Sequence, residues 1–154
     1  MPLADLLTSA ARGVHSSRIK GFTRIEAVLN QVENFIPVLR LGPSVFVSVP
    51  AELSDSQARF LQETVSHRLS KADGVRGLVI DVSALSLIDS FAAKILGETA
   101  SIASQFGVKA VLVGIRPAVA MTLIELGVDL RQVETALTLE RALTKLKIRI
   151  VEVE

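Results

Sequence analysis

A strand followed directly by a helix is predicted near the middle of the chain. The apolar run Leu78-Val79-Ile80 is typical of a strand that is covered on both faces. After Asp89, apolar and small residues recur every three or four positions, as on one stripe of a helix: Phe91, Ala92, Ile95, Leu96, Thr99, Ile102, Ala103 and Phe106. This junction predicts an α/β fold. It also puts Ser90 in the first turn of the helix, where free backbone N–H groups and the helix dipole favour an anion.

Strands and helices alternate along the rest of the chain after a first hairpin. Apolar runs bounded by turn residues predict strands over 36–40, 45–49, 76–81, 108–115 and 133–136. The helices are expected to begin at Ser54 with Gln57, at Asp89, at Pro117 and at Thr138. Because such an order requires right-handed crossovers, we expect a mixed, mainly parallel sheet of about five strands with about four helices. The third helix is predicted to turn Val119 or Ala120, Leu123 and Ile124 inward.

Residues 1–35 differ from the rest, because glycines and a polar run interrupt any long periodic element. From Phe22 to Phe35 the apolar residues fall on one helical stripe, which predicts a helix packed on the domain or on a neighbour, with a dedicated binding arm as the alternative. We therefore divide the chain into a partly helical N-terminal extension (1–35), a domain (36–147) and a C-terminal tail (148–154).

The C-terminal tail has a partial alternation of its own. Ile148, Ile150 and Val153 are apolar and are separated by charged or other residues. This pattern predicts either an edge strand or a docked end.

Composition excludes several classes of protein. The 154 residues suit one domain, and 49% of them are apolar although Trp and Tyr are absent, which favours self-association. The 17 basic and 16 acidic residues nearly cancel, so no net field would attract nucleic acid or acidic lipid. The absence of cysteine, of a secretory pattern and of a membrane-length apolar stretch predicts a cytoplasmic protein.

Catalytic and metal-binding patterns are missing from the sequence. His15 and His67 lie near no nucleophile motif, and Ser90 is flanked by Asp and Phe where a nucleophile elbow has glycines. No phosphate-binding loop or metal-ligand spacing is found. Glutamates are interleaved in the basic cluster, which therefore suits a solvated face: Arg131, Arg141, Lys145, Lys147 and Arg149. We expect no enzyme, no cofactor, no metal site and no nucleic-acid partner.

Two long motifs carry a resemblance to a known family. They are Ile88-Asp-Ser-Phe-Ala-Ala-Lys-Ile-Leu-Gly97 and Gly114-Ile-Arg-Pro-Ala-Val-Ala-Met-Thr-Leu-Ile-Glu-Leu-Gly127, and Glu134-Thr-Ala-Leu137 follows them. From about Ile36 to Leu146 the chain resembles a STAS domain, specifically the small scaffold subunit of the bacterial stressosome, an anti-sigma-factor antagonist. The resemblance implies the STAS fold for this part, whereas the extension departs from the short family members.

The resemblance also implies a function in partner switching. A serine/threonine kinase would phosphorylate Ser90, and the partner-binding surface would include Asp89, Ser90 and Phe91. The unphosphorylated protein would hold the kinase in a large homo-oligomeric assembly with a sensor STAS paralogue and would release it once phosphorylated. A second phosphorylated threonine of the sensor paralogues corresponds by position to Thr122. Two alternatives stay open, namely a free antagonist that binds an anti-sigma kinase directly and a STAS module that binds a small ligand or nucleotide.

The same residues also have purely structural interpretations, which are alternatives to these functional roles. Ser90 could simply help to satisfy the free N–H groups of the helix, and Asp89, with Ser86 three residues earlier, could be the helix cap. The Thr122 hydroxyl could bond to the preceding turn of its own helix. Gly97, inside a helix, is expected to allow the close approach of another backbone.

Overall fold

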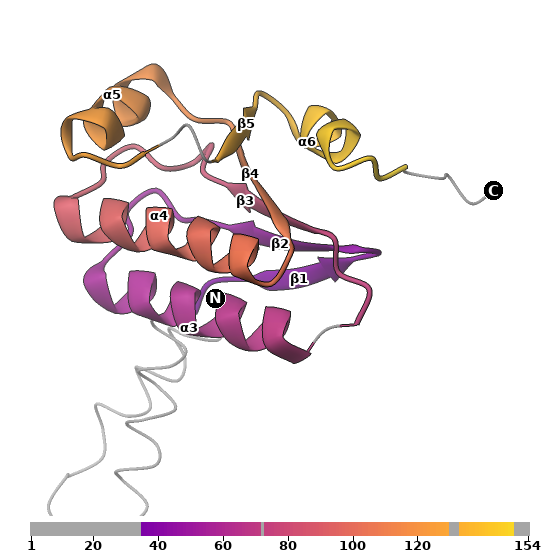
Figure 1. Cartoon of the computed structure of the whole chain (residues 1–154). Coiled ribbons are helices and arrows are strands. Elements are labelled where there is room, and N and C mark those ends of the chain that lie inside the picture. The colour runs from indigo at the N-terminus through magenta and orange to yellow at the C-terminus, as the bar shows by residue number, and fades with distance from the viewer. Residues whose placement is uncertain (1–34, 72, 130–132, 150–154) are drawn as a thin grey trace, which may run out of the picture. The chain divides into compact units, whose positions relative to one another are not determined.

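The computed structural model describes residues 35–71, 73–129 and 133–149 (Figure 1). Along the chain it contains β1 (Val38–Leu41), β2 (Ser44–Ser48), α3 (Asp55–Lys71), β3 (Gly77–Asp81), α4 (Ser90–Gln105), β4 (Lys109–Val113), α5 (Pro117–Glu125), β5 (Glu134–Ala136) and α6 (Leu139–Lys145). This order confirms the predicted succession of strands and helices. The helix predicted over Phe22–Phe35 and most of the C-terminal tail lie outside the described residues, so the division of the chain into 1–35, 36–147 and 148–154 stays a prediction.

The five strands form one sheet in the order β1-β2-β3-β4-β5. β1 and β2 are antiparallel, and every other neighbouring pair is parallel. The sheet is therefore mixed and mainly parallel, as predicted. Because β2, β3, β4 and β5 are parallel, their carboxyl ends meet at one edge, and the loop between β3 and α4 begins there.

The turn between β1 and β2 is tighter than the sequence suggested. Only Gly42 and Pro43 separate the two strands, and Gly42 has a φ of 56°, in the left-handed region that glycine adopts at no steric cost. The Ser44 hydroxyl donates to the carbonyl of Leu41 at 2.7 Å, which closes the turn. The backbone N–H of Arg76 donates to the Pro43 carbonyl at 2.7 Å and ties the turn to the start of β3.

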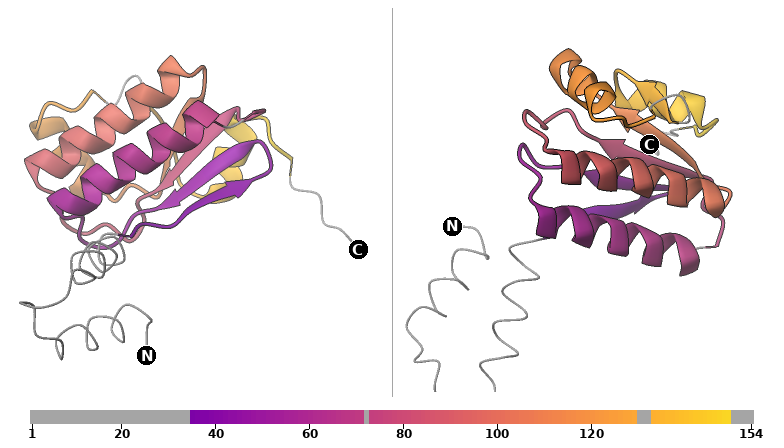
Figure 2. Two further views of the ribbon diagram at one scale, coloured as in Figure 1. Left: turned by 90° about the horizontal axis from the view of Figure 1, so that it is seen from below. Right: turned by 60° about the vertical axis from the view of Figure 1, so that its left-hand side comes forward.

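One face of the sheet is covered by α3 and α4, and α5 adds Val119 and Leu123 to the same core (Figure 2). The inward residues of α3 are those predicted, namely Ala58, Leu61, Val65 and Leu69. The prediction that Ile124 points inward is wrong, and Phe106, a member of the α4 stripe, is exposed as well. Phe106 is the C-cap of α4 and is 47% exposed, since the helix ends before it turns that side chain onto the sheet. Ile124 is 64% exposed, because only Val119 and Leu123 of α5 are buried.

The opposite face of the sheet carries a smaller core, which is covered by α6 (Figure 2). Ala142 of α6 and the C-cap residue Leu146 pack there against Val79, Val111 and Val113. The approach of α6 is close at Gly77, where an added Cβ would lie 2.6 Å from Leu146 Cδ1.

Helix caps follow the sequence pattern. The Gln57 N–H donates to Ser54 Oγ at 3.2 Å, and the Ser54 N–H donates to Gln57 Oε1 at 3.0 Å, so the capping box at α3 is confirmed. Thr138 caps α6 by accepting from the Arg141 N–H at 3.3 Å. Within the described ranges, no helix has the length and apolar character needed to cross a bilayer.

Candidate functional site

The start of α4 has the geometry of a capped helix terminus. Asp89 is the N-cap, with φ −91° and ψ 174°, and its Oδ1 accepts a hydrogen bond from the Ala92 N–H at 2.8 Å. Ser86, its predicted capping-box companion, instead donates its hydroxyl to the Ala51 carbonyl at 3.3 Å. Asp89 caps the helix, so Ser90 is its first residue. The Ser90 side chain is therefore not needed to cap the free backbone N–H groups.

Buried side chains, hydrogen bonds and one close backbone contact fix the loop that leads into α4. Its side chains Leu85 and Ile88 are buried, and the Ser86 N–H donates to the Ala51 carbonyl at 3.0 Å. Arg116 Nε donates to the Ser83 carbonyl at 3.1 Å. Next to it, Gly114 has a φ of 74°, and a Cβ there would lie 2.6 Å from Ser83 Cβ. The loop therefore presents Asp89 and Ser90 in a defined position.

The Ser90 side chain is exposed, and no hydrogen bond to its hydroxyl is found among the described residues. The capping interpretation of this hydroxyl is thus wrong, since Asp89 makes that bond. An exposed hydroxyl at the first position of a helix lies beside unpaired backbone N–H groups and the positive end of the helix dipole. Such a position can accept a phosphoryl group at low electrostatic cost.

A hollow of about 620 Å³ opens beside Ser90. Its walls come from α4 and from the segment that follows α5: Ser90, Phe91, Lys94, Gly97, Glu98, Ser101, Leu126, Gly127, Val128 and Asp129. Gly97 brings these walls together, because a Cβ there would lie 3.2 Å from Val128 Cγ1. The close neighbour of Gly97 is thus a side chain and not the backbone that the sequence suggested.

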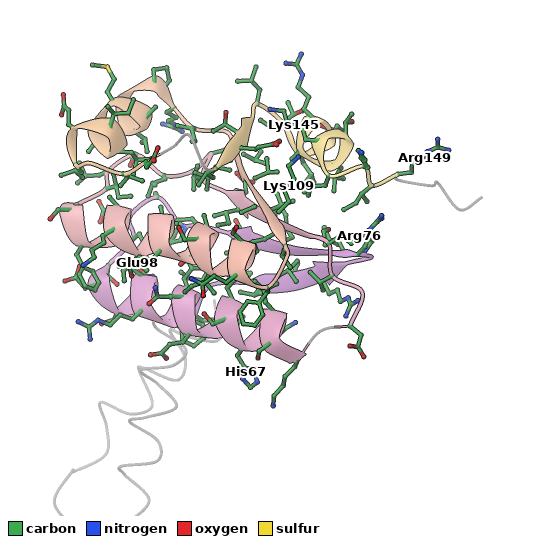
Figure 3. The ribbon with its side chains drawn as sticks, in the orientation of Figure 1. His67, Arg76, Glu98, Lys109, Lys145 and Arg149 are labelled. Atoms are coloured by element: carbon green, nitrogen blue, oxygen red, sulfur yellow. The ribbon has the colours of Figure 1, made fainter. Side chains whose placement is uncertain are left out.

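Charged side chains surround the start of α4. Lys94, one turn after Ser90, lies 3.8 Å from Glu98, and Glu98 accepts from Gln62 of α3 at 3.1 Å, on the side of α4 that faces α3 (Figure 3). The guanidinium of Arg59 lies 5.1 Å from the centre of the Phe91 ring. Helical spacing from Ser90 could have predicted Lys94, but no sequence signal places Arg59 or Val128 here.

The remaining candidate phosphosite, Thr122, is on α5. Its hydroxyl donates to the Ala118 carbonyl at 2.9 Å, as the structural interpretation predicted. The lining of the hollow beside Ser90 does not include Thr122. Ser90 and Phe91 line this hollow, whereas Asp89 lines a separate one together with Leu87 and Ile88, and Thr122 lines neither.

Known proteins with the same architecture support a specific family. The STAS domain family matches residues 36–142. RsbRB of Bacillus subtilis, an RsbT co-antagonist protein, is 28% identical over 108 residues, which cover 70% of this chain and 39% of RsbRB. The chain therefore spans well under half the length of that relative.

Two solved structures are similar over most of the domain. An RsbS variant of Moorella thermoacetica is 40% identical, with a TM-score of 0.66 and coverage of 73% of this chain and 94% of RsbS. A chain of the solved stressosome, described as a signal integration and transduction hub, is 41% identical, with a TM-score of 0.65 and coverage of 72% and 96%. With the five-stranded mixed sheet and the capped helix that begins at Ser90, these matches show that the chain belongs to the STAS domain family.

Proposed function

We propose that the protein is a non-catalytic scaffold of a stressosome-type assembly, in which phosphorylation of Ser90 releases a bound serine/threonine kinase. The domain over 36–147 would carry this function in the cytoplasm. The assembly would contain copies of this chain and a sensor STAS paralogue. The similarity to RsbS and to a stressosome chain, both at 40% identity or above, supports this assembly.

One observation carries the choice of Ser90. Its hydroxyl is exposed at the first residue of α4, and within the described part of the chain it makes no hydrogen bond. A kinase must reach the hydroxyl that it phosphorylates, and no bond to the protein has to break first. By contrast, the Thr122 hydroxyl is bonded to the Ala118 carbonyl, so Thr122 is the weaker candidate.

The chemistry at Ser90 would be a simple phosphoryl transfer from ATP to the Ser90 Oγ, with ADP as the leaving group. The product carries about −1.5 to −2 charges, which the free N–H groups at the helix start tolerate. Lys94, one turn later and paired with Glu98 at 3.8 Å, is within reach of the same side of α4. The fold would therefore survive the modification.

The partner surface would be altered much more than the fold. Phosphate next to Asp89 concentrates negative charge beside two exposed apolar residues, Leu87 at 69% and Leu126 at 42% exposure. A partner that packs on Leu87, Phe91 and Leu126 would have to desolvate this charge. Release of the kinase follows from that cost.

The test is incubation of the full chain with its cognate kinase and ATP, followed by mass spectrometry of peptides. We expect phosphate on Ser90 and its loss in Ser90→Ala. Ser101→Ala is the matched control, because Ser101 is an exposed serine on the same helix and lines the same hollow. Labelling of Ser90→Ala at the parental level, or phosphate found only on other residues, would rule the proposal out.

A further inference from the structure

One side of α5 is apolar and exposed. The helix contributes Val119 and Leu123 to the core, and these are its only buried residues. Four residues lie on the opposite side, at the three- and four-residue spacing of one helix face, and we call them the α5 face: Pro117, Ala118, Met121 and Ile124. Met121 is 63% exposed and Ile124 is 64% exposed. The helix itself lies at a corner of the domain (Figure 1 and Figure 2).

The two ends of the α5 face carry charges of opposite sign. No charged residue occurs from Pro117 to Ile124, whereas Arg116 precedes the helix and Glu125 is its last residue. Both are exposed, and among the described residues Glu125 has no ion pair. Arg116 uses Nε to donate to the Ser83 carbonyl at 3.1 Å, and no bond from its other N–H groups is found in the described part of the chain. The face is therefore an apolar surface with a positive start and a negative end.

The start of α5 also lacks a side-chain cap. Ser54, Asp89 and Thr138 accept hydrogen bonds from backbone N–H groups at the starts of α3, α4 and α6. The N-cap residue of α5 is Arg116, and its side chain makes no such bond. The N–H groups in the first turn of α5 therefore have no capping side chain, and the positive end of the helix dipole favours a carboxylate beside them.

We propose that the α5 face binds the α5 face of a second copy of this chain, with the two helices antiparallel. Met121 is the middle residue of α5, so a twofold axis between the two Met121 side chains brings the end of each helix to the start of the other. Glu125 of each copy then lies beside Arg116 and the uncapped N–H groups of the other copy. A parallel pairing would instead place like charges together.

Burial and charge favour the same arrangement. The contact removes the exposed side chains of Met121 and Ile124 from water in both copies, whereas an uncovered apolar patch would favour nonspecific association. The α5 face is separate from the candidate phosphorylation site, because none of its residues lines the hollow beside Ser90. The inference rests on the proposed function, since it assigns a surface to the contact between copies of this chain in the assembly.

Disulfide formation at the twofold axis tests this contact in the full chain, which has no cysteine of its own. The variant is Met121→Cys, and its matched control is Glu63→Cys, at an exposed position in the middle of α3. Facing Cα atoms of two helices packed about 8–10 Å apart lie about 4–5 Å from each other, which a disulfide can bridge. Non-reducing electrophoresis and intact mass should show that two chains are linked about tenfold faster in Met121→Cys than in the control, because the contact raises the effective concentration of the two thiols.

A change of charge tests the antiparallel orientation. Glu125→Lys, added to Met121→Cys, places a cation beside Arg116 and the helix start of the other copy, so the disulfide should form about tenfold more slowly. Glu63→Lys changes the net charge by the same amount and should leave the rate unchanged. Each rate is divided by the rate at which a small reagent alkylates the same thiol, which corrects for its reactivity. Equal corrected rates in the two backgrounds overturn the antiparallel pairing.

Light scattering of the same variants separates this contact from the proposed assembly. If Met121→Cys chains are linked no faster than Glu63→Cys chains while a particle of several copies is present, the α5 contact is wrong and the assembly stands. A monomer in light scattering contradicts both. If the thiol of Met121→Cys resists alkylation as well as linkage, another segment of the chain, such as 1–34, covers the α5 face, and the proposal is overturned. Phosphorylation of Ser90 is measured separately by mass spectrometry and depends on none of these results.

Discussion

Replacing Asp89 separates the stability of the candidate site from its function. Asp89→Ala removes the hydrogen bond of 2.8 Å from the Ala92 N–H to Oδ1. Loss of an N-cap side chain costs about 0.5–2 kcal/mol, and a carboxylate at an exposed helix start contributes about 0.3–1 kcal/mol. Asp89 is exposed, so both values fall in their lower halves. We expect the free energy of unfolding to fall by about 1–1.5 kcal/mol.

Asp89→Asn is the matched control for the hydrogen bond. Asparagine caps helices as well as aspartate does but carries no charge, so its cost should be only about 0.3–0.5 kcal/mol. Ser90→Ala should change stability by less than about 0.5 kcal/mol, because within the described residues its hydroxyl has no hydrogen bond to lose.

The assay is urea denaturation followed by circular dichroism, with equal m-values as the check that unfolding is comparable among variants. Equal losses for Asp89→Ala and Asp89→Asn would show that charge and not capping stabilises α4. A loss below about 0.3 kcal/mol for Asp89→Ala would refute the argument that this cap defines the start of the helix. Kinase binding by Asp89→Asn then reports on the partner surface alone, because its fold is retained.

Three further predictions test packing, assembly and domain division. Gly77→Ala should destabilise the chain by about 1–3 kcal/mol, because its Cβ would lie 2.6 Å from Leu146 Cδ1, and adding Leu146→Ala should cost less than the sum of the two single substitutions in urea denaturation. Multi-angle light scattering should show at least a homodimer at micromolar concentration and a larger particle with a sensor paralogue, whereas a monomer in both cases would support the free-antagonist alternative. Deleting residues 1–20 should leave the circular dichroism and thermal transition of the domain intact; unfolding at ordinary temperature would show that the early segment belongs to the core.

The sequence alone determined the order and type of the described elements, because hydrophobic periodicity and caps are local properties. The run Leu78-Val79-Ile80 is fully buried, as predicted for a strand covered on both faces. The capping box of Ser54 and Gln57 and the proline at the start of α5 were also predictable, since each depends on neighbours within one turn.

Tertiary structure decided how far each apolar stripe is buried. Phe106 and Ile124 continue their helical patterns but remain exposed, because the pattern says which residues share a side of the helix and not where the underlying sheet ends. The contact of Gly97 with Val128 and the hollow beside Ser90 bring together α4 and the segment after α5, which are distant in the sequence.

The same distinction applies to the candidate site. The sequence placed Ser90 at a helix start, since that required only the strand-to-helix junction. Whether its hydroxyl was bonded or free depended on Asp89 taking the cap while Ser86 bonded to Ala51. Leu39 and Leu41 of β1 are apolar and yet exposed, whereas α6 packs against β3, β4 and β5, because the strands that a helix covers are set by packing between elements, which no local pattern encodes.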